Sequence, residues 1–443
     1  MFEKLRPYLR ATSWPIIVAM LALMAVSLLA VRTAELADPR ALAGKTARQG
    51  LWIAVALVGF VAATVVPFQR VGRWAYVLFA LNLVLLVLVL VLPPVRGSHR
   101  WIRLWRFQFQ PSELAKLTYI LALAWYLRYR ENYRRLIGLI PPFVLTLVPA
   151  ALILIEPDLG TTLLLFPTLF FMLFMAGARL KHLLAVLAVA AAVVFLPVPY
   201  DLDAAGGRAA ASRAALAYFR CRIGGRRYAF VPAPLGRLPV LNRDIMRPHQ
   251  VRRIEGWLRQ GDEEVAWDQG FQLHQSMMVL GSGGLTGNKA SEALNLYIWW
   301  LPDDHTDFIY AVIGGQWGFR GCVGVLLIYA AIFVCGAEIA AITRDPFGRL
   351  LVVGVLALLF VQIFINVGMT IGLMPITGMT LPLVSFGGSS MLVNAVALGL
   401  LVNVGQRRPR SLSRKPFEYD AKAPEEQAAY RTPLAPLSGR RAG

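Results

Sequence analysis

Long apolar runs recur along the chain, and they constrain its fold more than any other feature. Four of them cover residues 14–31, 51–67, 75–93 and 351–372. A helix needs about 20 apolar residues to cross about 30 Å of hydrocarbon, and each run approaches or reaches that length. Hydrophobic residues make up 57% of the chain and charged residues 16%, against about 45–50% and about 25% in soluble domains. The sequence therefore predicts an all-α polytopic membrane protein.

About ten transmembrane helices fit the pattern, with a large extracytoplasmic loop between the seventh and the eighth. Short basic joints such as 69–73 and 128–135 belong in the cytoplasm under the positive-inside rule, which places both termini there. The expected spans are 14–31, 51–67, 74–92, 112–128, 137–155, 160–178, 183–199, 319–341, 350–373 and 386–405. The expected domain plan is a cytoplasmic N-terminus (1–13), helices 1–7 (14–199), the loop (200–307), helices 8–10 (308–405) and a disordered basic cytoplasmic tail (406–443).

Charge and cysteine content exclude some other classes. The formal net charge of +20 fits membrane topology and anionic lipid, so no nucleic-acid partner is expected. The basic start and first apolar run resemble a signal peptide, but further spans follow, so a retained first helix is expected. Three cysteines cannot form a full set of bridges, and a disulfide framework is not expected.

The segment from Gly97 to Leu117 places ionisable groups at a membrane edge. Pro111 stands where a helix begins, and Glu113 and Lys116 are three residues apart, hence on one face of the next span. A structural ion pair would explain them. Intramembrane ionisable residues are, however, functional candidates by default, and the outside arginines nearby favour a polar cavity that opens outward.

Three further stretches interrupt the apolar pattern. The acidic turn 155–162 has a structural explanation, a helix cap, as well as a functional one. The glycine-rich stretch 267–295 could let backbone N–H groups approach phosphate, but the glycines alone are a weak signal. The stretch 373–390 is broken by prolines and glycines, and we expect an outer loop that folds back against the bundle.

Together these motifs resemble the SEDS family of shape, elongation, division and sporulation proteins, which includes RodA, FtsW and SpoVE, with the RodA members the most similar. The resemblance covers residues 12–406 and rests on the ordered motifs FQPSELAK, EPDLGTT, GFQLHQS, GSGGLTG, LPDDHTDFIYAVIGGQWGFRG and MPITGMTLPLVSFGGSS. It implies a peptidoglycan glycosyltransferase of the bacterial inner membrane that polymerises lipid II at the outer face and serves cell elongation or division. It also implies a class B penicillin-binding protein as transpeptidase partner, within the elongasome or the divisome.

The implied chemistry joins two sugars that each arrive on a lipid pyrophosphate. The acceptor hydroxyl needs a carboxylate base, and the pyrophosphate leaving group needs cations. Arginine is suited to bind it, since its guanidinium is a bidentate phosphate ligand. No cofactor is expected, and a requirement for a divalent cation such as Mg²⁺ is left open. The expected substrate-binding residues are Arg100, Glu113, Lys116, Gln272, Gln275, Ser276, His305, Thr306, Asp307 and Ser385. No metal site is expected.

The base is where the sequence departs from the family pattern. In the family an aspartate stands five residues before the glycine of the GYQ element, whereas here that position is Val265. The candidates in QGDEEVAWDQGFQ are, in order of preference, Asp262, Asp268 and Glu264. A degenerate enzyme that has lost its base is the alternative.

Three rival functions share the expected topology. A lipid II flippase would also need a polar cavity, and an inert scaffold would only activate a penicillin-binding protein. An ion-coupled transporter fits less well, because the charges cluster at the outer boundary rather than at the midplane.

Overall fold

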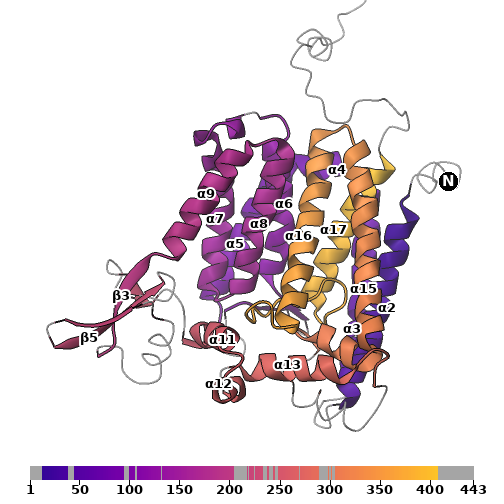
Figure 1. Cartoon of the computed structure of the whole chain (residues 1–443). Coiled ribbons are helices and arrows are strands. Elements are labelled where there is room, and N and C mark those ends of the chain that lie inside the picture. Colours follow the sequence, from indigo (N-terminus) through magenta and orange to yellow (C-terminus); the bar gives the residue numbers. More distant parts are fainter. Residues whose placement is uncertain are drawn as a thin grey trace, which may run out of the picture. The chain divides into compact units, whose positions relative to one another are not determined.

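The computed structural model describes a helical bundle with a layer of short elements across one end (Figure 1). It describes residues 12–37, 44–93, 99–104, 107–130, 132–203, 217, 219–223, 225–232, 237–238, 243–244, 248–268, 270–288, 298, 301 and 305–407. The bundle helices are α2 (Trp14–Ala37), α3 (Lys45–Val65), α4 (Phe68–Arg73), α5 (Ala75–Val91), α6 (Pro111–Leu127), α7 (Ile140–Ile155), α8 (Leu159–Ala176), α9 (Leu180–Val194), α15 (Ile309–Ile342), α16 (Pro346–Thr370) and α17 (Gly388–Gln406).

Each of the ten expected spans overlaps one of these helices. Within the described residues, seven helices are long and apolar enough to cross a membrane, and α5 and α9 are shorter apolar helices. The polytopic helical class is confirmed at this level, and the count of ten crossings stays a prediction. Residues 1–11 and 408–443, which hold most of the two expected cytoplasmic ends, lie outside the described residues.

Local signals set several helix ends. Pro111 opens α6 and Pro346 opens α16, where the missing N–H of proline costs nothing. The Asp158 side chain caps α8 by accepting from Thr161 N. At the other end of α8, Gly177 adopts a left-handed conformation with φ 97°, which glycine tolerates without strain.

The surface layer corrects the all-α expectation. It contains short helices and, among the described residues, three small antiparallel sheets with strand orders β1-β2, β3-β5-β4 and β6-β7. The strands are β1 (Ile102–Leu104), β2 (Phe107–Phe109), β3 (Pro197–Asp201), β4 (Phe219–Ile223), β5 (Arg226–Pro232), β6 (Arg237–Leu238) and β7 (Arg243–Asp244). Its helices are α11 (Pro248–Leu258), α12 (Glu263–Trp267) and α13 (Phe271–Ser282). Two short 3-10 helices, η1 (Asn132–Arg134) and η2 (Ile137–Leu139), lie at the opposite end of the bundle, where the Tyr133 hydroxyl donates to Ala176 O at the end of α8.

The expected seventh span is wrong at its end. The sequence predicts a helix over 183–199, whereas α9 ends at Val194 and β3 begins at Pro197. Pro197 and Pro199 cannot donate to a helical ladder, and their fixed φ suits an extended strand.

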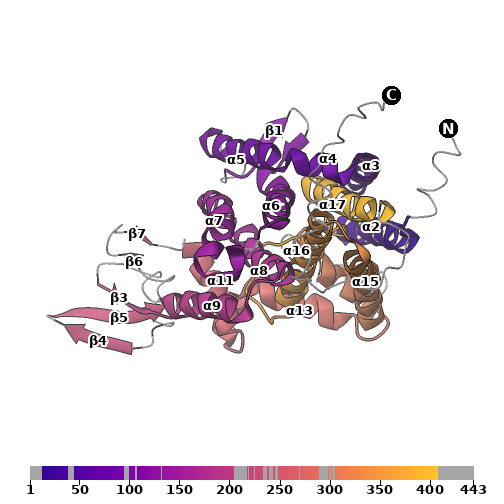
Figure 2. The ribbon, with the colours of Figure 1, turned by 90° about the horizontal axis from the view of Figure 1, so that it is seen from above.

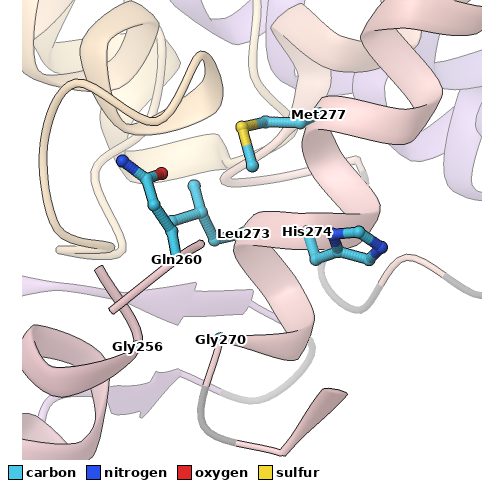
Figure 3. Close-up of a pocket in the computed structure, with 6 residues that line it drawn as sticks. All are labelled: Gly256, Gln260, Gly270, Leu273, His274 and Met277. Carbon is cyan, nitrogen blue, oxygen red and sulfur yellow. The ribbon is translucent and has the colours of Figure 1, made fainter. Parts of the chain in front are cut away.

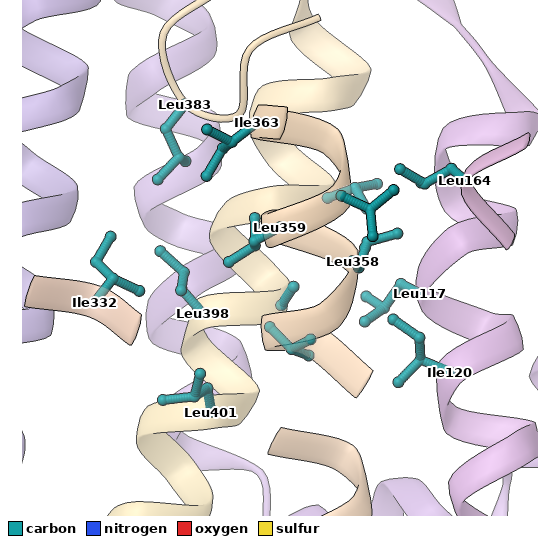
Figure 4. Close-up of a cluster of buried hydrophobic side chains, with 14 of the residues drawn as sticks. Leu117, Ile120, Leu164, Ile332, Leu358, Leu359, Ile363, Leu383, Leu398 and Leu401 are labelled. Carbon is teal, nitrogen blue, oxygen red and sulfur yellow. The ribbon is translucent and has the colours of Figure 1, made fainter. Parts of the chain in front are cut away.

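One large apolar core joins the bundle helices. Leu358 of α16, Leu398 of α17 and Leu164 of α8 are fully buried in it (Figure 4). A second, smaller core lies in the surface layer, where Tyr200 of β3 packs with Val251 of α11. The large core also includes Leu273 and Val279 of α13, so this part of the surface layer packs directly on the bundle.

Candidate functional site

The first turns of α6 hold a buried ion pair. Lys116 Nζ lies 2.7 Å from Glu113 Oε2, and the two side chains are 1% and 8% exposed. The i, i+3 spacing places both on one face of the helix, as the sequence predicts. Because both side chains are buried, they do not extend along the helix surface to reach water at its exposed end, as long charged side chains often do. The pair lies inside the bundle, where α6 packs against α5, α16 and α17.

The acidic turn between α7 and α8 is fixed by Arg100. The Arg100 guanidinium donates to the backbone oxygen of Glu156 over 2.9 Å and also to that of Pro157. Arg100 is expected to bind substrate phosphate. At least two of its five N–H donors are instead hydrogen-bonded to the backbone of this turn.

Glu156 is the most unusual acid in this region. Its side chain is fully buried, and neither carboxylate oxygen has a hydrogen-bond partner among the described residues. Its pKa is raised to about 8: burial is the largest cause, the negative charge of Asp158 acts in the same direction, and Arg100 acts in the opposite one. At neutral pH the folded protein therefore holds this carboxyl group mainly in its protonated form.

Asp158 connects the start of α6 to the start of α8. Its Oδ2 accepts from Ser112 Oγ at 3.3 Å and from Gln110 Nε2 at 3.2 Å. The Gln110 backbone N–H in turn donates to Ser389 Oγ of α17 over 3.1 Å. The FQPSELAK and EPDLGTT motifs, about 45 residues apart in the chain, thus meet the beginning of α17 at one end of the bundle.

The HTDF segment and the loop after α16 form a second junction at that end. Ser385 Oγ donates to the Thr306 backbone oxygen over 2.5 Å, and the Phe386 N–H donates to His305 O over 2.9 Å. The His305 and Phe386 rings meet edge to face with centroids 5.4 Å apart. The structure therefore brings together His305, Thr306 and Ser385. It also confirms that the loop folds back against the bundle, with Leu383 buried.

Gly378 joins this junction to the surface layer. A Cβ added at Gly378 would stand 3.4 Å from Asp307 Oδ2 and 3.9 Å from Arg253 Nη1. Asn366 Nδ2 of α16 donates to the Asp307 backbone oxygen over 2.9 Å. A carboxylate from the HTDF segment and a guanidinium from α11 thus approach the same glycine.

The three candidate bases lie on the surface layer rather than in the bundle. Asp262 precedes α12, is 40% exposed, and accepts from Arg259 Nη2 over 2.5 Å. Asp268 follows α12 and is exposed. Glu264 lies within α12, and its side chain is outside the described residues. Val265, at the position where the family pattern expects an acid, is buried.

The polar residues of α13 have different surroundings. Ser276 is fully buried and donates to the Thr370 backbone oxygen over 3.1 Å, which ties α13 to the end of α16. Gln275 is buried, and its Oε1 has no hydrogen-bond partner among the described residues. Gln272 is half-buried. Of the three, Ser276 serves the fold.

The clustered glycines after α13 allow two backbones to approach closely. A Cβ at Gly283 would stand 1.9 Å from Gly314 O, and one at Gly287 would stand 2.2 Å from Gln316 O. Both distances are too short for any side chain. The glycines pack against the first part of α15, which is a structural role rather than the phosphate contact considered from the sequence.

A hollow lies between α11 and α13 (Figure 3). It is lined by Gly256, Gln260, Gly270, Leu273, His274 and Met277. Its interior has no room for a water molecule, so it is no substrate pocket as it stands. Among the described residues, no three His, Cys, Asp or Glu side chains gather closely enough to hold a metal ion.

Most of the chain matches one known protein family. A profile of the family described as "Cell cycle protein", covering FtsW, RodA and SpoVE, matches residues 10–206 and 228–409. The chain belongs to this family. The match covers the bundle and most of the surface layer, so the protein is a multi-pass membrane protein of the family.

Individual relatives agree. RodA of Treponema pallidum, named a peptidoglycan glycosyltransferase, is 30% identical over 422 residues, which cover 89% of this chain and 97% of that protein. FtsW of Geobacter metallireducens, named a probable peptidoglycan glycosyltransferase, is 30% identical over 366 residues, covering 81% and 84%. The stage V sporulation protein E of Bacillus subtilis is 29% identical over 367 residues, covering 81% and 86%.

Solved structures share the fold. A chain from "Structural coordination of polymerization and crosslinking by a peptidoglycan synthase complex" superposes with a TM-score of 0.68 at 26% identity, covering 90% of this chain and 99% of that one. The crystal structure of the Thermus thermophilus rod shape determining protein RodA superposes with a TM-score of 0.59 at 25% identity, covering 90% and 98%.

Sequence reasoning missed several residues that build this end of the bundle. Gln362 and Asn366 of α16 hold the returning loop through Thr380 O and Met379 O. Gln49 of α3 donates to Ser385 O over 3.3 Å. The available signal was the presence of lone amides in or beside apolar helices, because a buried amide needs hydrogen-bond partners.

Proposed function

We propose that this protein is a peptidoglycan glycosyltransferase that polymerises lipid II at the outer face of the bacterial inner membrane. The observation that carries the proposal is the meeting of the separate family motifs at one end of the bundle, through the Asp158 network and the Ser385–Thr306 contact. They meet there in a chain whose relatives bear that activity in their names.

We place that end outside the cell and both termini in the cytoplasm, with ten crossings. The opposite end carries the basic joint of α4, with Arg70 and Arg73 in its last turn, and the positive-inside rule puts such joints in the cytoplasm. Cysteines introduced at Arg70 and at Asp203, each in a Cys221→Ser, Cys335→Ser background, test this orientation: in intact cells a membrane-impermeant thiol reagent should modify only the second.

The reaction forms one glycosidic bond and breaks one bond to phosphate. The acceptor hydroxyl attacks the anomeric carbon of the donor sugar, a carboxylate removes the hydroxyl proton, and undecaprenyl pyrophosphate leaves with the bonding electron pair. Attack opposite the leaving group inverts the anomeric centre. The protein supplies a base and a cationic surround for the departing pyrophosphate.

Asp262 is our first choice for the base, before Asp268 and Glu264. It is accessible to a headgroup outside the bilayer, and its partner Arg259 is also 42% exposed. The layer that carries it is joined to the bundle, since Trp257 Nε1 donates to Gly372 O over 3.1 Å. An acid at this position can therefore meet a sugar that arrives from the membrane edge.

The test is polymerisation of labelled lipid II by the purified protein in proteoliposomes. Asp262→Ala should abolish glycan chains. Asp203→Ala is the matched control, because Asp203 is a similarly exposed acid of the same loop and pairs with Arg227 at 2.8 Å; it should retain activity. Full activity in the alanine variants of Asp262, Asp268 and Glu264 alike would reject the assignment of the base.

The same preparation separates the rival functions. We propose a class B penicillin-binding protein as partner, and the assay is run with and without it. Lipid II that crosses the bilayer without forming chains would identify a flippase. Absence of chains with and without the partner, together with increased transpeptidase activity of the partner, would identify a scaffold.

A further inference from the structure

The three-stranded sheet β3-β5-β4 includes a part of the chain that the family profile does not match. The profile stops at residue 206 and resumes at 228, so β4 and the start of β5 fall in the gap. The sheet is antiparallel, with Tyr200 opposite Ala229 and Phe219 opposite Phe230. Successive residues of a strand point to opposite faces, so these pairs define the two faces of the sheet.

One face of the sheet is part of the protein's interior. Tyr200, Ala229 and Val231 are at most 2% exposed and pack with Val251 of α11 in the smaller core. This face joins the sheet to the helix layer that precedes Asp262.

The opposite face is largely apolar and open, with the ion pair of Asp201 and Arg226 toward one end of it. Phe219 is 62% exposed, and its ring centroid lies 6.2 Å from that of Phe230. Tyr228 and Cys221 pair with each other on this face, and Pro199 lies opposite Phe230. A sheet face of this composition on a water-soluble surface would be a liability, so it calls for a covering partner.

The chain leading into the sheet identifies that partner. The end of α9 is exposed at Val193 (58%) and Val194 (43%), and the connection to β3 is exposed at Phe195 (66%) and Leu196 (56%). In a multi-pass membrane protein, apolar side chains exposed on an outer helix face lipid. Since β3 begins at Pro197, the sheet starts where α9 leaves the bilayer. Figures 1 and 2 show its strands side by side, extending from the end of α9 away from the bundle.

Arginines lie on both faces of the sheet: the strand pairing places Arg226 on the face of Phe219, and it places Arg220, Arg222 and Arg227 on the face of Ala229. Arg226 and Arg227 at the start of β5 are 69% and 65% exposed, and Arg220 and Arg222 of β4 are also exposed. Asp201 and Asp203 contact the first two, but a guanidinium has five donors and keeps others available. Aromatic rings beside arginines are the composition that membrane interfaces favour, with rings at headgroup level and guanidinium groups on phosphate.

We propose that this sheet is an interfacial membrane anchor. The face that carries Phe219 enters the headgroup boundary of the outer leaflet, and Arg226, on the same face, binds a phospholipid phosphate. Because the other face packs on α11, the anchor sets the height of the Asp262 layer above the bilayer. The anchor rests on membrane insertion and not on the proposed glycosyl transfer, so either can fail without the other.

The test uses nitroxide labels along β4 in proteoliposomes, read by collision with oxygen, which partitions into lipid, and with a water-soluble nickel chelate. Native Cys221 is labelled in a Cys335→Ser background, and single cysteines at Phe219, Arg220 and Arg222 are labelled after Cys221→Ser is added. The Cys221→Ser protein without an introduced cysteine reports any labelling of buried Cys322.

The expected result alternates along the strand. Labels at 219 and 221 should collide preferentially with oxygen and labels at 220 and 222 with the nickel chelate. Preferential nickel collision at all four positions would overturn the proposal. So would protection of 219 and 221 from both reagents, because that pattern marks a protein contact.

A second variant separates lipid contact from loss of the sheet. Phe219→Ser should raise nickel collision at Cys221 several-fold. The label at 220, beside Ala229, should keep its mobility if the sheet remains folded. If the nickel collision rate at Cys221 and the mobility of the label at 220 both stay unchanged, anchoring through Phe219 is contradicted. If the label at 220 becomes mobile, the substitution has unfolded the sheet, and the collision pattern at the four positions decides.

Discussion

Replacing Glu156 with glutamine tests the electrostatics of the turn between α7 and α8. The folded protein holds this buried carboxyl group with a pKa of about 8, against an ordinary value of 4.5. A glutamine has nearly the same shape and stays neutral at every pH. The substitution therefore removes the titration while leaving the packing in place.

The sign of the effect follows from proton linkage. Below pH 4.5 the group is protonated in both the folded and the unfolded chain, and its contribution to stability is fully present. Between that value and a pH of about 8, the unfolded chain ionises while the folded one does not, so stability falls as pH rises. From the ordinary pKa of 4.5 to neutral pH is roughly 2.5 pH units. At about 1.4 kcal/mol per unit, the folded protein is less stable at neutral pH than at low pH by on the order of 3 kcal/mol.

The assay compares thermal unfolding of the wild type and Glu156→Gln in lipid nanodiscs across this pH range. The two midpoints should agree near pH 4, and the variant should become the more stable one as pH rises, with the gap levelling off above pH 8 or so. Parallel pH profiles would refute the reasoning. A variant less stable than the wild type at alkaline pH would show that Glu156 is ionised and has a cationic partner.

Three further substitutions probe the bundle, each measured as a change in unfolding free energy. Lys116→Met leaves Glu113 buried without its partner and should lower the unfolding free energy by about 3–5 kcal/mol. Adding Glu113→Gln should recover most of that loss, and a double variant no more stable than the single one would contradict the prediction. Gly318→Ala forces alanine into φ 65°, ψ −163°, with a Cβ 2.4 Å from Gly287 N, and should cost at least about 1–3 kcal/mol; wild-type stability would show that α15 runs straight. Asn403→Ala removes a buried amide that donates to backbone oxygens between α3 and α4, and should cost about 1–3 kcal/mol; a neutral result would mean that water replaces it.

The helices could be predicted because their signal is local. An apolar run long enough to cross a bilayer has few other stable structures, since each unpaired backbone group in lipid costs several kcal/mol. The sheets could not, because β3 and β4 are short and combine proline, arginine and single aromatic residues. Their stability comes from pairing with β5 and packing on α11, contacts that the sequence of either strand does not contain.

The site was predictable in part. Spacing alone placed Glu113 beside Lys116, because helix geometry fixes which residues share a face. The meeting of Thr306 with Ser385 depends on a contact across 79 residues, and only the family resemblance pointed to it. The role of Arg100 was not predictable, since no local pattern shows that backbone carbonyls would occupy its guanidinium.

The glycine contacts after α13 determine which part of the surface layer can move. Asn288 N donates to Gly315 O, and Phe319 N donates to Gly284 O, so the chain after α13 and the break in α15 form one stiff unit. The hydrogen bond from Trp257 Nε1 to Gly372 O holds α11 against the end of α16. The stretch from Arg259 to Gly270, which includes α12, therefore connects two elements that are both fixed to the bundle, α11 and α13. The acids on this stretch are therefore held close to the end of the bundle, and their approach to a sugar would require α12 to move while the rest of the layer stays in place.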